Sequence, residues 1–379
     1  MAELRPLGTN TIRAGAAVVA LLLVVGVGYA LLHGSAGLGP SGGSGPLTSG
    51  GSKAPEFVGI TDWENSPALQ ISKLRGKVVL VDFWTYSCIN CQRTFPFLRD
   101  WWHKYRDSGL VIVGVHSPEF EFEKSVPNIR QAITHYGVEW PVAVDSEMAT
   151  WNAYQNQYWP AEYLIDKNGL IRDTHFGEGN YDQTERNIRL LLNEAGHTVL
   201  ASPGASIDAG ITQDANAQTQ ELYAGRQEFY GNQQAFTPGQ PFDFHDPAPI
   251  VEGAHTDNLI YWQGRWTIHD PSQGEYAQHA RSSSLGQDYA LIDYRARQVF
   301  MVAATSSTTQ RVYLQLDGHD LASSDAGADV RFDGSGHAYV DIDRSDLFAL
   351  VKRADFTRHV LTVSPTGTGF ELFTFTFGS

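Results

Sequence analysis

The chain contains only two cysteines, Cys88 and Cys91, with Ile89 and Asn90 between them. In a Cys-x-x-Cys dithiol, one thiolate attacks a partner disulfide and the second thiol displaces the mixed disulfide that forms. A disulfide scaffold would instead need more cysteines in a smaller chain. The spacing therefore predicts thiol-disulfide exchange, with Cys88 as the attacking thiol and Cys91 as the resolving thiol, and we expect no cofactor.

A cysteine pair at this spacing could also belong to a metal site or form an inert structural disulfide. Tetrahedral zinc needs four ligands, and the chain has no second cysteine pair to complete the set. His116, at the end of a neighbouring predicted strand, is a candidate ligand, but a lone histidine there is more often an ordinary polar residue. We expect no metal, and the structural disulfide stays as an alternative.

The cysteines fall where a predicted strand passes into a predicted helix. Residues 78–84 form a nearly continuous apolar run, typical of a buried central strand, and residues 91–105 have helical spacing of apolar side chains. Cys88 then lies at the helix N-terminus, where unpaired N–H groups and the helix dipole stabilise a thiolate. This position favours Cys88 as the nucleophile.

Helical and strand periodicities continue to alternate after the cysteines, which indicates an α/β domain with a parallel component over residues 55–200. The predicted elements are a strand at 110–115, a helix at 128–136, a strand at 142–144, a helix at 148–154, a hairpin of 163–166 with 170–176, and a helix at 181–195.

The segment VVLVDFWTYSCINCQRTFPFL is similar to the thioredoxin superfamily, and W-T-Y-x-C-I-N-C resembles the thioredoxin domain of DipZ-type and TlpA-like proteins. The resemblance implies a thioredoxin-like fold across most of residues 55–200. It also matches Pro160, in YWPAEYLIDKNG, to the family's cis proline, which faces the active-site cysteines.

Asp82, six residues before Cys88, matches the buried acid that accepts the proton of the resolving cysteine in thioredoxins. A buried strand carboxylate has a raised pKa, which suits proton exchange with a thiol near neutral pH. The alternative is a hydrogen-bonded, purely structural role. Many TlpA-like proteins place a glutamate three residues after the second cysteine, where this chain has Thr94, so Asp82 is expected to carry the proton role alone.

Aromatic residues are expected to border the cysteines and to form a substrate groove with Pro160. Trp84 and Tyr86 lie on the approach to the cysteine turn, and Trp159 precedes the proline. Trp84 has an equally strong interpretation as plain core packing. The sequence thus predicts substrate contacts at Pro160, Trp159, Trp84 and Tyr86.

Residues 14–32 are 19 uncharged, mostly apolar residues, enough for a single transmembrane helix. Arg5 and Arg13 precede them and no Lys or Arg follows before Lys53, so residues 1–13 are expected to be cytoplasmic and both globular domains extracytoplasmic. A cleaved signal peptide is the alternative. Residues 33–54 are rich in Gly, Ser and Pro and read as a flexible linker.

A second linker at residues 201–215 leads to short alternating segments over residues 216–379, which predict an all-β sandwich, jelly-roll-like. Residues 347–351 read as a short helix or an edge turn. Through QELYAGRQE, GRWTI, RVYLQLDG and FTFTFG, this part resembles the carbohydrate-binding-module-like domain of DipZ-type proteins. Exposed Trp262 and Trp266 would stack on sugar rings, but glycan binding rests on this resemblance alone.

The formal net charge of −15 disfavours nucleic-acid binding through phosphate contacts. The leading hypothesis is a membrane-anchored reductase of extracytoplasmic protein disulfides. DipZ-like proteins carry a multi-span electron-conducting module, so the resemblance implies a separate membrane electron donor of the CcdA type here. The alternative is an envelope ligand-binding or scaffolding protein with a structural disulfide. A thiol peroxidase is disfavoured because no P-x-x-x-T-x-x-C motif surrounds Cys88.

Overall fold

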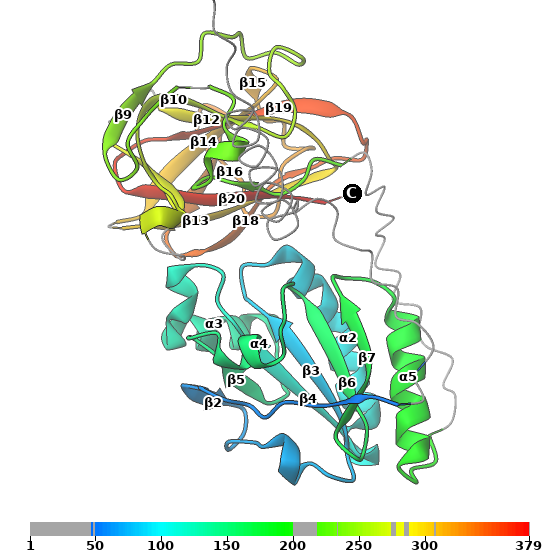
Figure 1. Ribbon diagram of the computed structural model, residues 1–379. Helices are drawn as coiled ribbons and strands as arrows, with labels where there is room; N and C mark the ends of the chain where they lie inside the picture. Colours follow the sequence, from blue (N-terminus) through cyan, green and yellow to red (C-terminus); the bar gives the residue numbers. More distant parts are fainter. Residues whose placement is uncertain are drawn as a thin grey trace, which may run out of the picture. The chain divides into compact units, whose positions relative to one another are not determined.

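The computed structural model describes residues 47, 50–199, 218–232, 234–273, 278–283, 288–306 and 308–378. These residues belong to one compact unit, residues 43–379, in which an α/β domain precedes an antiparallel β-domain (Figure 1). The predicted anchor at 14–32, the linker at 201–215 and most of the linker at 33–54 lie outside the described residues. In the described part of the chain, no helix has both the length and the apolar character needed to cross a bilayer.

The α/β domain is built on a seven-stranded sheet of order β1-β7-β6-β3-β4-β5-β2. Strand β3 pairs in parallel with β4, and β4 with β5, while β6 and β7 form an antiparallel hairpin at one side. The strands are β1 (Ser52–Lys53), β2 (Asp62–Glu64), β3 (Val78–Trp84), β4 (Leu110–His116), β5 (Val142–Val144), β6 (Ala161–Ile165) and β7 (Leu170–Phe176). This arrangement confirms the predicted thioredoxin-like domain.

Helices cover both faces of this sheet. The α-helices are α2 (Ile89–Tyr105), α3 (Val126–Tyr136), α4 (Ala149–Ala153) and α5 (Tyr181–Glu194), with 3-10 turns η1 (Ile71–Lys73), η2 (Arg106–Ser108) and η3 (Glu121–Lys124). Residues Val78, Leu80 and Trp84 of β3 pack with α2, α3 and α5, whereas Val79 and Val81 share a second cluster with α4. Because both faces are buried, the sequence of β3 is apolar at every position except Asp82.

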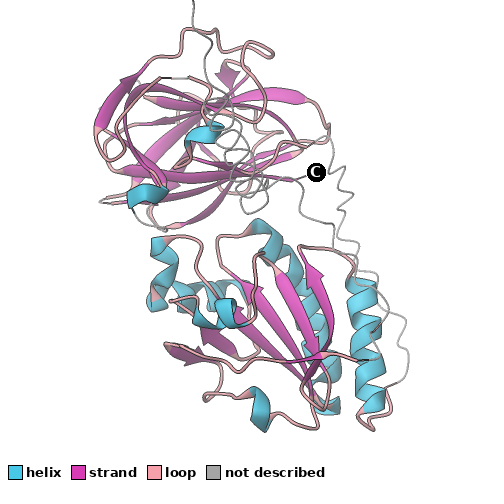
Figure 2. Ribbon diagram, viewed as in Figure 1, coloured by secondary structure: helices cyan, strands magenta, loops and turns pink. Residues whose placement is uncertain are grey.

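The regular elements of the β-domain are nearly all strands, joined by loops (Figure 2). Its elements are β8 (Leu222–Tyr223), β9 (Pro241–Phe244), β10 (Ile260–His269), β11 (His279–Ser282), β12 (Tyr289–Arg295), β13 (Gln298–Thr305), β14 (Gln310–Leu316), β15 (His319–Asp320), β16 (Arg331–Phe332), β17 (Ala338–Ile342), β18 (Asp346–Lys352), β19 (Arg358–Pro365) and β20 (Phe370–Gly378), with 3-10 turns η4 (Gln227–Phe229) and η5 (Pro271–Gln273). The predicted all-β second domain is thereby confirmed.

Strand β10 joins the two sets of antiparallel strands in this domain. Its first half pairs with β12, and its second half pairs with β9 and β11. Gly264, at the change of partners, has φ +88°, a conformation that a residue with a Cβ adopts only at a cost. Trp262 and Trp266 flank it and are fully buried in the core cluster. Both tryptophans are therefore core residues and not an exposed sugar-stacking platform.

One element prediction in the β-domain is wrong. Residues 347–351, expected to form a short helix or an edge turn, belong to strand β18, which pairs with β13. Phe348 packs in the core of the β-domain, while the neighbouring Leu347 packs against a cluster shared with the α/β domain. Burial on both faces removed the polar alternation that marks a strand in sequence.

The two domains share a buried apolar cluster, which we call the interdomain cluster. Its buried members are Ile89 and Phe120 from the α/β domain and Val302, Ala304, Leu347 and Phe373 from the β-domain. The rings of Phe120 and Phe373 meet edge to face with centroids 5.0 Å apart. Since Ile89 directly follows Cys88, the β-domain packs beside Cys88.

Candidate active site

Cys88 and Cys91 occupy the first turn of α2. Cys88 is the N-cap residue, with extended backbone angles, and its Sγ accepts a hydrogen bond from the Cys91 N–H at 3.4 Å. Cys88 is partly exposed, whereas Cys91 is completely buried. The exposed thiol can reach a partner disulfide, and the buried thiol can reach only the neighbouring sulfur.

The buried thiol needs a base before it can attack. Burial raises the pKa of the Cys91 thiol well above its usual value, and the hydrogen bond and charge of Cys88 raise it further. A thiol with a raised pKa carries its proton at neutral pH, although the thiolate is the reactive form. Resolution through Cys91 therefore requires a nearby proton acceptor.

Asp82 fits this requirement. It lies on β3, on the face that α2 covers, and is completely buried. Neither carboxylate oxygen has a hydrogen-bond partner among the described residues. Burial raises the pKa of Asp82 to about 7, and its charge contributes to the raised pKa of Cys91. An acid with a pKa near neutrality can both accept and return the thiol proton.

A second buried carboxylate fixes the loop that leads into Cys88. Glu123 Oε1 accepts from the Ser87 hydroxyl at 2.5 Å, and Oε2 accepts from the backbone N–H groups of Glu119 at 2.6 Å and Phe120 at 2.9 Å. Burial raises the pKa of Glu123. The segment PEFEFE, residues 118–123, thus holds Ser87, the residue before Cys88.

Tyr86 and His116 stack next to this loop, with ring centroids 5.6 Å apart. His116 is completely buried, and burial lowers its pKa to about 3, so that it is neutral. The Tyr86 hydroxyl donates to the Phe122 carbonyl at 3.3 Å, and burial, followed by the charge of Glu123, raises the pKa of Tyr86. His116 is therefore part of the site's packing.

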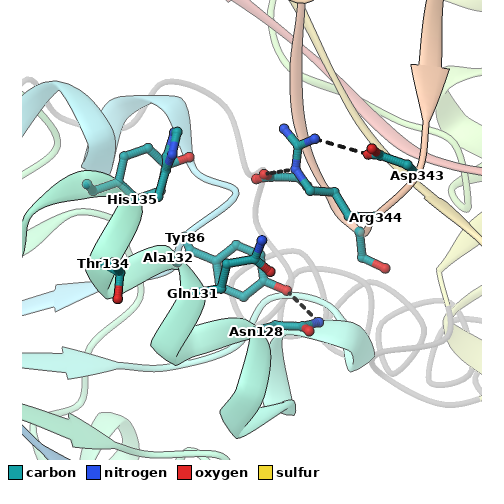
Figure 3. Close-up of a pocket in the computed structure, with 11 residues that line it drawn as sticks. Tyr86, Asn128, Gln131, Ala132, Thr134, His135, Asp343 and Arg344 are labelled. Atoms are coloured by element: carbon teal, nitrogen blue, oxygen red, sulfur yellow. Dashed lines mark hydrogen bonds and ion pairs between the residues drawn. The ribbon is translucent and has the colours of Figure 1, made fainter.

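The predicted substrate residues separate into two grooves. Tyr86 lines a groove of about 900 Å³, together with Asn128 from α3 and Arg344 from the β-domain (Figure 3). Trp159 lines another groove of about 290 Å³, to which Tyr223 of the β-domain also contributes. Tyr86 and Trp159 therefore do not form one continuous wall.

Pro160 follows Trp159 in a cis peptide bond, the isomer that the family resemblance implies. The Trp159 indole N–H donates to the Ser117 carbonyl at 3.0 Å, and its ring lies 4.1 Å from that of Trp151. These contacts hold the partly exposed Trp159 at the start of β6. Pro160 itself is buried.

Trp84 is not a substrate-binding residue. Its side chain is completely buried, meets Phe95 edge to face, and belongs to the core under α2. The strand alternation that directs Asp82 toward α2 directs Trp84 to the same covered face. Thr94, which occupies the position of the family's glutamate, donates to the Cys91 carbonyl at 2.7 Å and cannot serve as a base.

Sequence reasoning missed Glu162 on β6, which is 4% exposed and faces Asp82 across the sheet. The sequence did contain a signal for this residue. A carboxylate inside the apolar strand AEYLI is as unfavourable to bury as Asp82 inside VVLVDFW. Within the described ranges, no three His, Cys, Asp or Glu residues group as metal ligands.

Comparisons with known proteins agree with this geometry. Residues 51–174 match the model of the AhpC/TSA family, and residues 219–378 match that of the thioredoxin like C-terminal domain. DipZ of Mycobacterium bovis is 38% identical over 275 residues, which are 71% of this chain and 37% of DipZ. The chain thus spans less than half the length of the DipZ proteins that it matches.

Two smaller proteins are also similar. A solved thiol-disulfide isomerase of Corynebacterium glutamicum is 25% identical with a TM-score of 0.33, over 37% of this chain and 96% of that one. The thiol-disulfide oxidoreductase YkuV of Bacillus subtilis is 30% identical over 140 residues, which are 37% of this chain and 94% of YkuV. Since YkuV is matched almost end to end, the chain belongs to the family of thioredoxin-like thiol-disulfide oxidoreductases.

Proposed function

We propose that this chain is a membrane-anchored reductase of protein disulfides outside the cytoplasm, acting through Cys88 and Cys91. The observation that carries the proposal is the pairing of a partly exposed Cys88 at the N-terminus of α2 with a buried Cys91 whose N–H contacts the Cys88 sulfur. An inert staple has no need of an exposed sulfur or of a buried acid behind it.

The reaction transfers two electrons from the dithiol to a substrate disulfide. The Cys88 thiolate attacks one substrate sulfur, the substrate S–S bond breaks, and the first substrate thiolate leaves. Cys91 then gives its proton to Asp82 and attacks Cys88 Sγ. The bond between Cys88 and the substrate breaks, the second substrate thiolate leaves, and the protein retains a Cys88–Cys91 disulfide.

A separate electron donor must restore the dithiol after each turnover. The apolar run at residues 14–32 and the preceding Arg5 and Arg13 support an anchor with its N-terminus inside. A membrane donor of the CcdA type would then meet the α/β domain close to the bilayer.

The groove beside Trp159 and Pro160 is the proposed binding place for the substrate chain. It is lined by Trp159, Asn156 and Gln157 from the α/β domain, and by Tyr223 and Arg226 from the β-domain. Aromatic rings and amide groups suit an extended peptide, which needs apolar contact and hydrogen-bond partners. Glycan binding by the β-domain stays a prediction from resemblance.

The reduction potential of the dithiol in the full-length chain tests the direction of the reaction. Equilibration against glutathione and dithiothreitol, with thiols quantified, should give a reduction potential of about −270 mV, as in thioredoxin. A value near about −120 mV would indicate an oxidase. A pair that never cycles would favour the scaffolding alternative with a structural disulfide.

Trapping of the mixed disulfide tests the assignment of the two cysteines. Cys91→Ser should accumulate a covalent complex between Cys88 and a disulfide-containing protein substrate, because the resolving thiol is absent. Cys88→Ser is the matched control and should form no complex. Equal trapping by both variants, measured by non-reducing electrophoresis, would contradict the assigned roles.

A further inference from the structure

Three polar side chains form a buried row across the sheet behind the cysteines. Asp82 on β3 is directly opposite Glu162 on β6, and Glu162 is directly opposite His175 on β7. Opposite residues on paired strands point to the same face, with Cβ atoms about 4.5 to 5.5 Å apart. Asp82 is 0% exposed, and Glu162 and His175 are each 4% exposed. The row therefore runs from β3, which α2 and Cys91 cover, through β6 to β7.

Helix α5 covers this row with polar side chains. The Thr184 hydroxyl donates to Glu162 Oε2 at 3.3 Å, and the Asn187 amide donates to Asp173 Oδ2 at 2.6 Å. Thr184 and Asn187 are buried, although α5 otherwise packs through residues such as Ile188. On the other side of Asp82, the β4 residue in register is Gly114, which offers no side chain. Glu162 is thus the ionisable group that Asp82 faces on the neighbouring strands.

Two facing carboxylates in a buried place cannot both ionise cheaply. Burial raises the pKa of Asp82 to about 7, and burial followed by the charge of Asp82 raises the pKa of Glu162 to about 8. The pair then releases its two protons in separate steps that belong to the pair as a whole. The other titratable groups around it are Cys91 from α2, His116 from β4, Asp173 and His175 from β7, and Tyr181 from α5.

We propose that Asp82 and Glu162 act as an electrostatically coupled pair that holds one proton, mainly on Glu162, and that Glu162 is a positioning residue which keeps Asp82 ready to accept the proton of Cys91. This inference rests on the proposed reductase function. A proton held on Glu162 leaves Asp82 charged and free to act as the base. When Cys91 attacks Cys88 Sγ, its proton moves to Asp82 and the pair becomes neutral. One proton then leaves from Glu162 by way of the His175 imidazole, and the reverse transfer accompanies reduction of the disulfide.

Stopped-flow reduction of 5,5′-dithiobis(2-nitrobenzoate) by the full-length chain tests the proposal. The first coloured thiolate reports attack by Cys88, and the second reports resolution by Cys91. The wild-type resolution rate should follow both ionisations of the pair between about pH 5 and pH 9. Glu162→Gln should slow resolution at pH 7 by about tenfold and remove the upper ionisation, because an amide cannot exchange a proton. The attack by Cys88 should change little.

Two further variants separate this role from a loss of packing. Glu162→Asp retains a carboxyl group and should restore the upper ionisation. Glu185→Gln is the matched control. Like Glu162, Glu185 is a buried glutamate, but it lies on α5 and accepts a hydrogen bond from the Tyr105 hydroxyl, away from the row of Asp82, Glu162 and His175. A Glu162→Gln variant with an unchanged pH profile, or a Glu185→Gln variant with the same loss, would overturn the shared-proton pair. Wild-type protein that never releases the second thiolate would instead contradict the proposed function.

A measurement on unmutated protein covers the case in which Glu162→Gln does not fold. The infrared difference spectrum between reduced and oxidised protein at pH 7 should contain a protonated carboxyl band. Carbon-13 labelling of glutamate carboxyl groups should shift that band, because the shared proton resides mainly on Glu162. A spectrum without a glutamate-shifted band would overturn the proposal.

Discussion

Asp82 costs the folded protein stability whenever it is charged. Its pKa is about 7 in the folded chain, against an ordinary value of 3.8. Between these two pH values the folded state holds a proton that the unfolded state releases, so stability falls as the pH rises. A buried carboxylate with a structural role is normally hydrogen-bonded, and Asp82 is not. Its cost in stability therefore supports a role in proton transfer.

Replacement of this carboxyl should remove the pH dependence that it causes. In the wild-type protein, the free energy of unfolding should fall between pH 5 and pH 8. Asp82→Asn should make this fall smaller by about 1 to 4 kcal/mol, measured by urea denaturation. The change in unfolding free energy between the two pH values is compared, because the buried asparagine amide itself destabilises the variant at both. Asp107→Asn, at an exposed position, should leave the wild-type slope unchanged. A slope that Asp82→Asn does not alter would contradict a raised pKa at this position.

At the scale of elements, the loop before α2 and the turn η3 act together. Glu123 of η3 accepts hydrogen bonds from Ser87 and from two backbone N–H groups of its own segment. A charged acceptor holds such donors more firmly than a neutral one. The turn therefore fixes Ser87, the residue before Cys88, although Glu123 lies 36 residues from Ser87 in the sequence.

Neutralising this acceptor should loosen the loop. Glu123→Gln should lower the unfolding free energy by about 1 to 3 kcal/mol and slow the alkylation of Cys88, since an amide offers one acceptor oxygen where the carboxylate has two. Glu121→Gln, in the same turn but largely exposed, is the matched control and should change neither quantity by much. Equal effects from both variants would show that the turn, and not the Ser87 contact, is responsible.

At the scale of the molecule, the β-domain is a structural neighbour of the cysteines. Phe373 of β20 packs on Phe120 and Phe122, and Ile89 belongs to the same interdomain cluster. The partly buried carboxylate of Glu119 accepts a hydrogen bond from the Tyr223 hydroxyl of the β-domain at 2.7 Å. The β-domain therefore covers residues that lie next to Cys88.

Truncation within the interdomain cluster should uncouple the domains. Phe373→Ala should cost about 3 to 5 kcal/mol and should split a single calorimetric unfolding transition into two, because a large buried ring is lost. The alkylation rate of Cys88 should rise at the same time. Phe332→Ala is the matched control, since Phe332 is exposed on β16. An unchanged transition and an unchanged alkylation rate would indicate that the cluster does not join the domains.

Local patterns in the sequence determined the dithiol, the strand that leads into α2, the buried Asp82 and the order of two domains. These features depend on neighbours within a few residues, such as a carboxylate inside an apolar run. The tertiary structure alone decided that Glu162 faces Asp82, that Trp84 is buried while Trp159 is partly exposed, and that residues 347–351 form a strand. Each of these depends on which strands become neighbours and on what covers their faces. Periodicity along a single strand indicates whether its faces are buried, but not which strands lie beside it or which elements cover it.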